Sequence, residues 1–243
     1  MPRLRILRRP AAPADPLLRE TWSGVSRRHL LIAVAGWVLA ARRPARGQTP
    51  KDVFLWTFDQ NPVDEPPLEW EAQAGRWVVR PEGGGAMNRV LVHTGPSPLG
   101  LDMPVILTPI VPVHDLTASV RFRRTGSGVA ETMALVLRWY DAANMTLVTV
   151  EGSAGRIWVE QLRAGARRLL FGTAVAIPPE RWHRLDVSAL GERVAVGLDG
   201  RPLGTARDPE PAPGRVGLAG RPGAGMLLDD LEVVPLPDPF PPR

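Results

Sequence analysis

Residues 182–200, WHRLDVSALGERVAVGLDG, decide the fold. Apolar side chains alternate with other residues in this stretch, so that Val194, Val196 and Leu198 share one face of an extended segment. Gly191-Glu192 and Asp199-Gly200 interrupt the alternation, and Asp-Gly favours the type I′ turn of a two-residue hairpin. Period-two alternation between turns is typical of half-buried antiparallel strands. The stretch therefore predicts consecutive β-hairpins.

The same pattern extends outward over most of the chain. Leu116, Ala118, Val120 and Phe122 again share one face, and no window after residue 50 has the 3.6-residue period of a helix. Gly and Pro recur between such segments at roughly the 8–12-residue spacing of all-β proteins. These segments predict strands at 53–58, 68–72, 75–80, 89–94, 103–110, 116–123, 131–140, 144–151, 155–163, 167–172, 182–189, 192–199, 213–219 and 226–234. Such a series closes its core as a two-sheet sandwich or a barrel.

Charge is distributed very unevenly along the 243 residues. Residues 1–47 hold ten Arg against two acidic residues, a net charge of +8, whereas residues 48–243 have a net charge of −3. The basic character therefore belongs to an N-terminal arm, which argues against nucleic-acid binding by the whole domain. The chain has no Cys, which excludes disulfides, thiolate metal sites and Cys nucleophiles.

The arm has the layout of an export signal. Ser26-Arg27-Arg28-His29-Leu30-Leu31 follows an Arg-rich segment and opens an apolar run over residues 30–41. This run is shorter than the ~20 residues of a membrane-spanning helix. The Arg pair resembles a twin-arginine signal, and the Arg residues at 42, 43 and 46 disfavour the general secretory route. An uncleaved signal anchor or a basic tail on a cytosolic protein are the alternatives.

Three regions are expected from these observations. Residues 1–47 form a twin-arginine-type signal peptide with a signal-peptide helix, residues 48–234 form the sandwich, and residues 235–243 form a Pro-rich tail. The expected partner of the arm is the twin-arginine export machinery. The protein is then bacterial, its location is periplasmic or secreted, and its mature domain does not span the membrane.

The C-terminal half carries a characteristic succession of segments. Their ranges are 137–144 (LRWYDAAN), 155–160 (GRIWVE), 182–187 (WHRLDV), 194–200 (VAVGLDG), 214–218 (GRVGL) and 228–233 (LDDLEV). This succession resembles the concanavalin A-like lectin/glucanase superfamily, and within it the laminin-G-like and 3-keto-disaccharide-hydrolase-like exported bacterial domains. The resemblance implies an all-β, two-sheet antiparallel jelly-roll sandwich. That fold hosts lectins, hydrolases and adhesion modules, so it does not specify a function.

A ligand site is expected at the end of strand 131–140. Arg138, Asp141 and Asn144 match the Arg-x-x-Asp-x-x-Asn positions of the resembled family, and alternation turns Arg138 and Tyr140 outward if Leu135, Leu137 and Trp139 are core. These four residues would line the concave sheet and bind a glycan. Alternatively, Arg138 pairs with Asp141 and only fixes the hairpin. Most Trp residues are expected in the core, while any exposed one offers a stacking surface for sugars.

A structural calcium ion is a second expectation. Asp59 follows the first strand and Asp229 lies on the last, and the resembled superfamily often holds Ca²⁺ where these strands meet. Carboxylate oxygens suit that ion, although both residues can equally be exposed groups at strand ends. His93, His114 and His183 show no spacing of a zinc or iron site. No other cofactor is expected.

Catalysis is not expected from the sequence. The glucanase branch of the resembled superfamily carries a Glu-x-Asp-x-x-Glu segment, which this chain lacks, and Asp229-Asp230-Leu231-Glu232 fails its spacing. The leading hypothesis is therefore an exported, non-catalytic carbohydrate-binding or interaction module. A glycoside-processing hydrolase or lyase of the keto-disaccharide type is one alternative. The other is a protein-docking scaffold, which predicts a concave face filled by loops or lined by aliphatic side chains.

Overall fold

The computed structural model describes residues 52–83, 87–95, 103–126, 131–221 and 225–237. All regular elements within these ranges are β-strands. None of these residues belongs to a helix long and apolar enough for a membrane crossing. The strands are β1 (Phe54–Trp56), β2 (Glu71–Ala72), β3 (Arg76–Pro81), β4 (Arg89–Thr94), β5 (Val105–Leu107), β6 (Asp115–Arg124), β7 (Thr132–Asp141), β8 (Asn144–Glu151), β9 (Arg156–Arg163), β10 (Ala166–Ala174), β11 (Trp182–Leu190), β12 (Arg193–Leu198), β13 (Arg201–Arg207), β14 (Arg215–Gly220) and β15 (Met226–Leu236).

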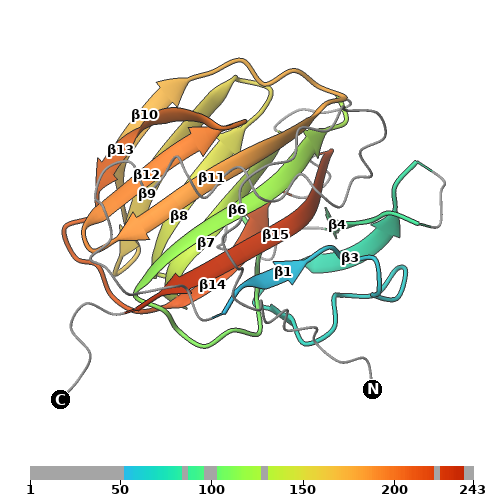
Figure 1. Cartoon of the computed structure of the whole chain (residues 1–243), viewed down its shortest axis with the longest axis horizontal. Helices are drawn as coiled ribbons and strands as arrows, with labels where there is room; N and C mark the ends of the chain where they lie inside the picture. Colours follow the sequence, from blue (N-terminus) through green and yellow to red (C-terminus); the bar gives the residue numbers. More distant parts are fainter. Residues whose placement is uncertain (1–51, 84–86, 96–102, 127–130, 222–224, 238–243) are drawn as a thin grey trace, which may run out of the picture.

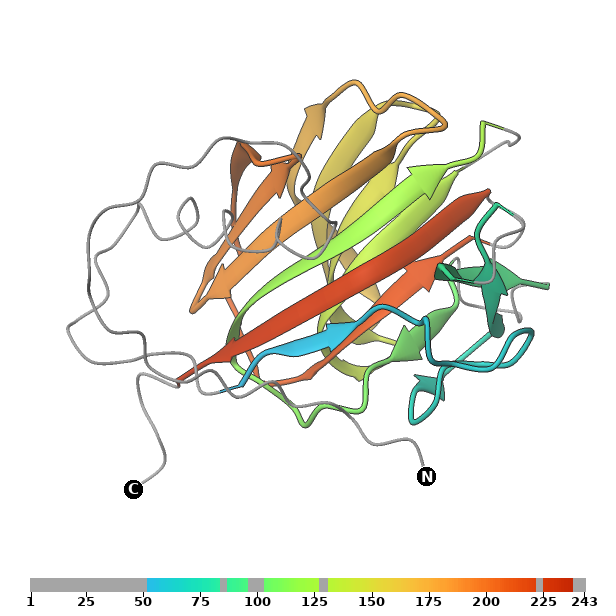
Figure 2. The same cartoon turned by 45° about the vertical axis from the view of Figure 1, so that its right-hand side comes forward.

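Two antiparallel sheets pack face to face (Figures 1 and 2). The eight-stranded sheet has the order β13-β12-β11-β6-β15-β4-β3, with β1 also paired to β15, and the seven-stranded sheet has the order β10-β9-β8-β7-β14-β5-β2. Distant segments meet in both sheets, because β6 lies between β11 and β15, and β14 lies between β7 and β5. This arrangement confirms the predicted two-sheet antiparallel sandwich.

The main core lies between the sheets and follows the predicted alternation. Phe122 and Val120 of β6, Leu185 of β11 and Leu135 of β7 belong to one buried cluster. Burying such side chains stabilises the fold by roughly 1.5–3 kcal/mol each. Four of the six Trp residues after residue 50 are buried, as expected, whereas Trp158 and Trp182 are half-buried.

Tight turns and close approaches fix the register. Asp199 and Gly200 both adopt positive φ, of 52° and 76°, as a type I′ turn requires. Gly191 also has a positive φ, 50°, in the turn between β11 and β12. At Gly214, a Cβ atom would lie 2.3 Å from the backbone of Arg138. Only glycine therefore allows these two segments to approach so closely.

The structure departs from the predicted strands at two places. Strand β13 was not predicted, because Pro202 and Gly204 interrupt its pattern, yet it forms the edge of the eight-stranded sheet. Strand β15 continues through Leu236, into the segment expected as a tail. The expected signal peptide at 1–47 and residues 238–243 of the expected tail lie outside the described residues.

Candidate functional site

Three of the predicted ligand residues lie together at the turn that joins β7 to β8. Tyr140 is 80% exposed. Asp141 Oδ1 accepts hydrogen bonds from the Ala143 backbone N–H and from Asn144 Nδ2, both at 2.8 Å. Asn144 Oδ1 accepts a hydrogen bond from the Ala164 backbone N–H at 3.0 Å. The Asp and Asn side chains are therefore engaged in holding two neighbouring hairpin loops.

Arg138, the fourth predicted residue, does not point outward, so that expectation is wrong. A bulge interrupts the pairing of β7 and β8 after Leu137, and Arg138 has a positive φ of 54°. The bulge shifts the alternation, so Leu137 belongs to the core between the sheets while Trp139 packs on the other side of the sheet. The Arg138 side chain is only 1% exposed. It is thus separated from Tyr140 and from the turn.

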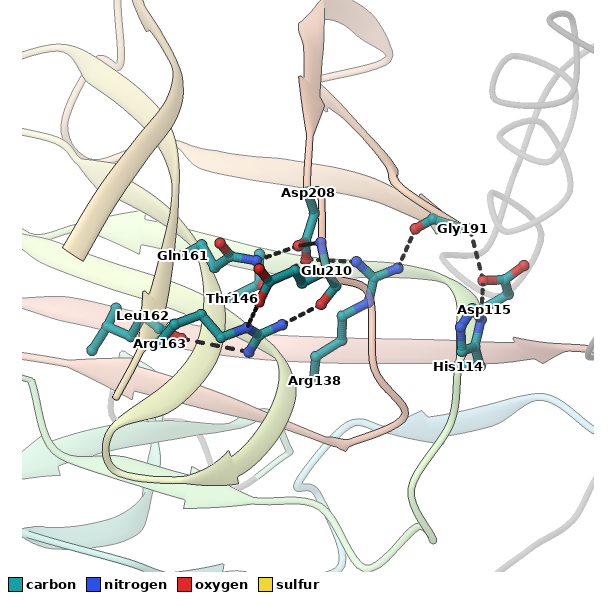
Figure 3. Close-up of polar contacts among 10 residues, drawn as sticks. All are labelled: His114, Asp115, Arg138, Thr146, Gln161, Leu162, Arg163, Gly191, Asp208 and Glu210. Carbon is teal, nitrogen blue, oxygen red and sulfur yellow. Dashed lines mark hydrogen bonds and ion pairs between the residues drawn. The ribbon is translucent and has the colours of Figure 1, made fainter. Parts of the chain in front are cut away.

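Arg138 is held inside the sandwich by groups far away in the sequence (Figure 3). Its Nη1 donates to Asp208 Oδ2 at 2.6 Å, and its Nη2 donates to the Gly191 carbonyl at 2.6 Å. Asp208 is fully buried and also accepts hydrogen bonds from Thr146 Oγ1 and Gln161 Nε2. The alternative in which Arg138 pairs with Asp141 is therefore also wrong, and this network is an internal structural one.

The outer face of the seven-stranded sheet, which points away from the other sheet, is divided into two halves. Strands β5, β7 and β14 and the first part of β8 carry an apolar half. Its members form a separate buried cluster: Met103, Val105, Leu107, Ala134, Val136, Trp139, Met145, Leu147, Leu162 and Ala219. A cavity beside Met145 has a volume of only about 20 Å³, enough for about one water molecule. This half is therefore lined by apolar side chains, Trp139 among them, and this cavity is too small for a ligand larger than water.

The other half of this face is polar and centres on Trp158 of β9. Ile157 and Val159 point into the core, so Arg156, Trp158 and Glu160 point outward. Arg156 pairs with Glu151 of β8 at 2.5 Å, and its guanidinium carbon lies 5.7 Å from the centre of the indole.

On the other side of the indole, Glu160 accepts a hydrogen bond from Arg167 Nη1 at 3.2 Å. We call the surface formed by Glu151, Arg156, Trp158, Glu160 and Arg167 the Trp158 surface.

The indole of Trp158 is half-buried and has small residues beside it on both neighbouring strands. Gly172 lies directly opposite it on β10, and Thr149 lies opposite it on β8. A Cβ atom at Gly172 would lie 3.7 Å from the Cβ of Trp158, so any larger side chain would cover part of the ring. The Trp158 surface was not predicted, although the alternation over residues 156–160 already places Arg156, Trp158 and Glu160 on one face.

Asp59 and Asp229, the predicted calcium ligands, lie near each other. The Asp59 charge contributes to raising the pKa of Asp229 to about 8, after burial of Asp229 and repulsion from Asp230. Asp59 Oδ1 accepts a hydrogen bond from the Arg89 backbone N–H at 2.9 Å. Within the described ranges, no group of three or more acidic or histidine side chains is arranged to hold a metal ion. The two residues therefore do not by themselves form a cation cage.

Comparisons with known proteins place the fold. No protein-family model and no curated protein sequence matches the chain. The chain is similar to carbohydrate-binding module CBM66 from Bacillus subtilis, with 20% identity and a TM-score of 0.51 over 69% of this chain and 92% of that one. It is also similar to domain 4 of an extracellular GH43 arabinanase from Geobacillus stearothermophilus, solved in complex with arabinotriose, with 14% identity and a TM-score of 0.53 over 75% and 91% of the two chains.

A third similar structure is a galectin-like protein from Bacillus subtilis, with 12% identity and a TM-score of 0.50 over 69% of this chain and 89% of that one. At these identities the likeness concerns the arrangement of strands. Together with the two sheets described above, it shows that the chain has the concanavalin A-like jelly-roll fold.

Proposed function

We propose that the chain is an exported, non-catalytic carbohydrate-binding module, and that the Trp158 surface holds the glycan. The observation that carries this proposal is a half-buried indole opposite a glycine, flanked by two arginine–glutamate pairs. Sugars present apolar C–H faces that stack on an aromatic ring, while donors and acceptors beside the ring bind their hydroxyls. Arginine supplies the donors here, and glutamate supplies the acceptors.

The spacing along β9 fits a short oligosaccharide. Arg156 and Glu160 are four residues apart on one strand, which corresponds to ~13 Å with Trp158 in the middle. The similarity in fold to a carbohydrate-binding module and to a domain solved with arabinotriose supports a sugar as the ligand. Residues 1–47 supply the export signal in this proposal, and loss of export on changing Arg27 and Arg28 to Lys would test it.

The same spacing supports a binding role without catalysis. Glu160 pairs in register with Leu147 on β8, whereas Glu151 lies four residues further along that strand. The backbone positions of these two glutamates are therefore about 13 Å or more apart along the sheet. Glycosidases place their two carboxyl groups about 5–9.5 Å apart. The Glu151 and Glu160 carboxylates are also both engaged by arginine.

A protein-docking scaffold is the second candidate function. The apolar half of the same sheet face is lined mostly by aliphatic side chains, as that alternative predicts, with Trp139 as the exception. All of these side chains are buried, however, so the face exposes little apolar area for a partner. The Trp158 surface is the more accessible part and therefore favours a glycan.

A glycan array with the purified full-length chain tests the proposal. We expect specific binding that falls about 30-fold, or about 2 kcal/mol, in Trp158→Ala. Trp182→Ala is the matched control, because Trp182 is also half-buried on a strand but lies on the other sheet. Binding unchanged by Trp158→Ala would overturn this site. Release of reducing or keto sugars would instead favour the hydrolase or lyase alternative.

Gly172→Val tests the same site without changing any proposed contact residue. Gly172 does not require a glycine conformation, and its neighbour Trp158 lies at an ordinary packing distance. We expect valine to cover part of the indole and weaken glycan binding about tenfold, with little effect on stability. A variant that binds like the original chain would show that the ligand does not contact this side of the ring.

A further inference from the structure

A row of carboxylates crosses the outer face of the eight-stranded sheet. Asp186 of β11 and Glu232 of β15 both lie directly opposite Ser119 of β6. The neighbours of these residues along each strand belong to the core, so all three side chains point away from it. A bulge at Asp229 and Asp230 turns Asp229 toward the same face, opposite Arg121. We call Asp186, Glu232 and Asp229 the acidic row.

Among the described residues, the acidic row forms one ion pair, between Arg184 and Asp186, for its three carboxylates. Arg184 Nε bonds Asp186 Oδ1 at 2.8 Å, but Asp186 Oδ2 is buried without a hydrogen-bond partner and the residue is only 7% exposed. Arg121 forms its ion pair with Asp230 rather than with Asp229. No ion pair to Glu232 is found among the described residues. Burial raises the pKa of Asp186 and of Glu232, and the charge of Asp186 raises that of Glu232 further, although the nearby Arg184 acts in the opposite direction on both. A buried carboxylate oxygen without a donor is costly, so a donor brought to Asp186 Oδ2 would stabilise the folded domain.

The N-terminal arm joins the domain beside this row. Strand β1 pairs with β15 so that Leu55 lies opposite Glu232. The chain therefore enters the fold next to one end of the row. Residues 1–47 carry a net charge of +8, against −3 for residues 48–243, and three arginines lie at positions 42, 43 and 46.

These arginines are close enough to reach every carboxylate of the row. An extended chain spans ~3.3–3.6 Å per residue, so the six residues from Asp52 back to Arg46 can cover about 20 Å. Asp186 lies two strands from β15, which is about 10 Å at the usual strand spacing. Attachment through the chain also gives these side chains an effective concentration of roughly millimolar at the row.

We propose that the acidic row is a binding site for guanidinium groups, and that its occupant is the segment 42–46 of the same chain. A guanidinium presents its N–H groups in a planar fork that matches a carboxylate and supplies the donor that Asp186 Oδ2 lacks. Docking holds the arm against the folded domain. If the arm is an export signal, the export machinery must displace it from the row. This inference does not depend on glycan binding at the Trp158 surface.

A spin label in the arm tests the proposal in the full chain. Because the chain has no cysteine, Ala41→Cys gives a single labelling position. We expect the label to broaden the backbone amide signals of residues 117–121 and 184–188 in NMR spectra at low salt. Changing Arg42, Arg43 and Arg46 to Gln leaves the domain itself untouched. We expect this change to lower the docking equilibrium constant about fivefold, or about 1 kcal/mol.

The acidic row is tested separately with Asp186→Asn combined with Glu232→Gln. We expect this double variant to lower the docking equilibrium constant by the same factor. The matched control combines Asp141→Asn with Glu151→Gln on the other sheet and should keep the broadening. The proposal is overturned if the unmodified arm causes no broadening of these signals. It is also overturned if the broadening survives in the arginine variant, or if Ca²⁺ alone shifts the amide signals of the row while the label has no effect.

Discussion

Arginine–carboxylate pairs occupy two contrasting places in this molecule. At one end of the sandwich, Arg138 and Asp208 are 1% and 0% exposed, and protein groups engage both arginine Nη atoms (Figure 3). On the Trp158 surface, Arg156 and Arg167 are 60% and 43% exposed and keep part of their guanidinium in solvent. Residue type therefore does not separate a structural pair from the pairs that we propose to bind a ligand. Exposure of the arginine does, because an exposed arginine contributes little to stability and remains accessible to a ligand.

The largest effect is expected at the buried pair. Asp208→Ala leaves the Arg138 guanidinium buried without its carboxylate, and we expect this to lower the free energy of unfolding by about 3–5 kcal/mol. Urea unfolding of the variant and the original chain measures this difference in the free energy of unfolding. Glu151→Ala, which breaks an exposed pair, should cost at most about 1 kcal/mol. Similar small losses in both variants would contradict the distinction between the two places.

Asp229 extends the comparison to a buried carboxyl that none of the described arginines bonds. Its pKa is raised from 3.8 to about 8, mainly by burial and by repulsion from Asp230. The folded state therefore binds this proton more tightly than the unfolded state does, so stability is highest below about pH 4 with respect to this group. Its contribution is lost as the pH rises toward 8.

Asp229→Asn should consequently raise the free energy of unfolding by about 2 kcal/mol at pH 8 and leave it nearly unchanged at pH 4. Asparagine retains the oxygen that accepts the Asp230 backbone N–H. Thermal unfolding of both proteins across this pH range measures the difference. Equal pH dependence in the two proteins would show that Asp229 ionises normally.

A smaller effect is expected at the pairs of the Trp158 surface, whose arginines are exposed. Glu160→Gln keeps the shape of the side chain but removes its charge, so we expect about fivefold weaker glycan binding, or about 1 kcal/mol, with unfolding unchanged. Glu192→Gln is the control, because Glu192 also forms an exposed pair, with Arg207, far from Trp158. Calorimetric titration with the glycan compares the affinities of the two variants. An equal loss in both variants would point to a general effect of charge.

The smallest effect is expected at the β7–β8 turn. Tyr140→Ala removes an exposed ring that lies outside the Trp158 surface, so glycan affinity should change less than about twofold. Surface plasmon resonance with the best glycan measures this. A large loss would move the binding site to the hairpin that the sequence favoured.

Most of the fold could be predicted because its signals are local. Alternation located the strands of both sheets, and Asp199-Gly200 identified a turn whose positive φ values the structure confirms. Strand β13 was not predicted because Pro202 and Gly204 interrupt the alternation of apolar side chains. Pro202 suits an edge strand, because no backbone N–H is needed on the side of the strand that has no partner. Gly204 leaves room for the ring of Phe171.

The site was harder to predict because it depends on long-range contacts. A bulge at Arg138 reverses the alternation that the sequence suggests, and its partner Asp208 lies 70 residues away. An outward Trp158 was not predicted, although it agrees with the alternation over residues 156–160, and only the structure gives its pairing with Gly172. Local pattern thus predicts which way a side chain points, and topology decides what it meets.

The most direct test of the proposed glycan site is an NMR titration that follows the indole N–H signals of Trp158 and Trp182 with the best glycan from the array. The Trp182 indole already donates to Glu82 at 2.9 Å and lies beneath Arg121 and Arg123. The account predicts that the Trp158 signal shifts and saturates with the glycan while that of Trp182 stays in place. A shift of Trp182 alone, or of the residue 140–144 amides without Trp158, would contradict it.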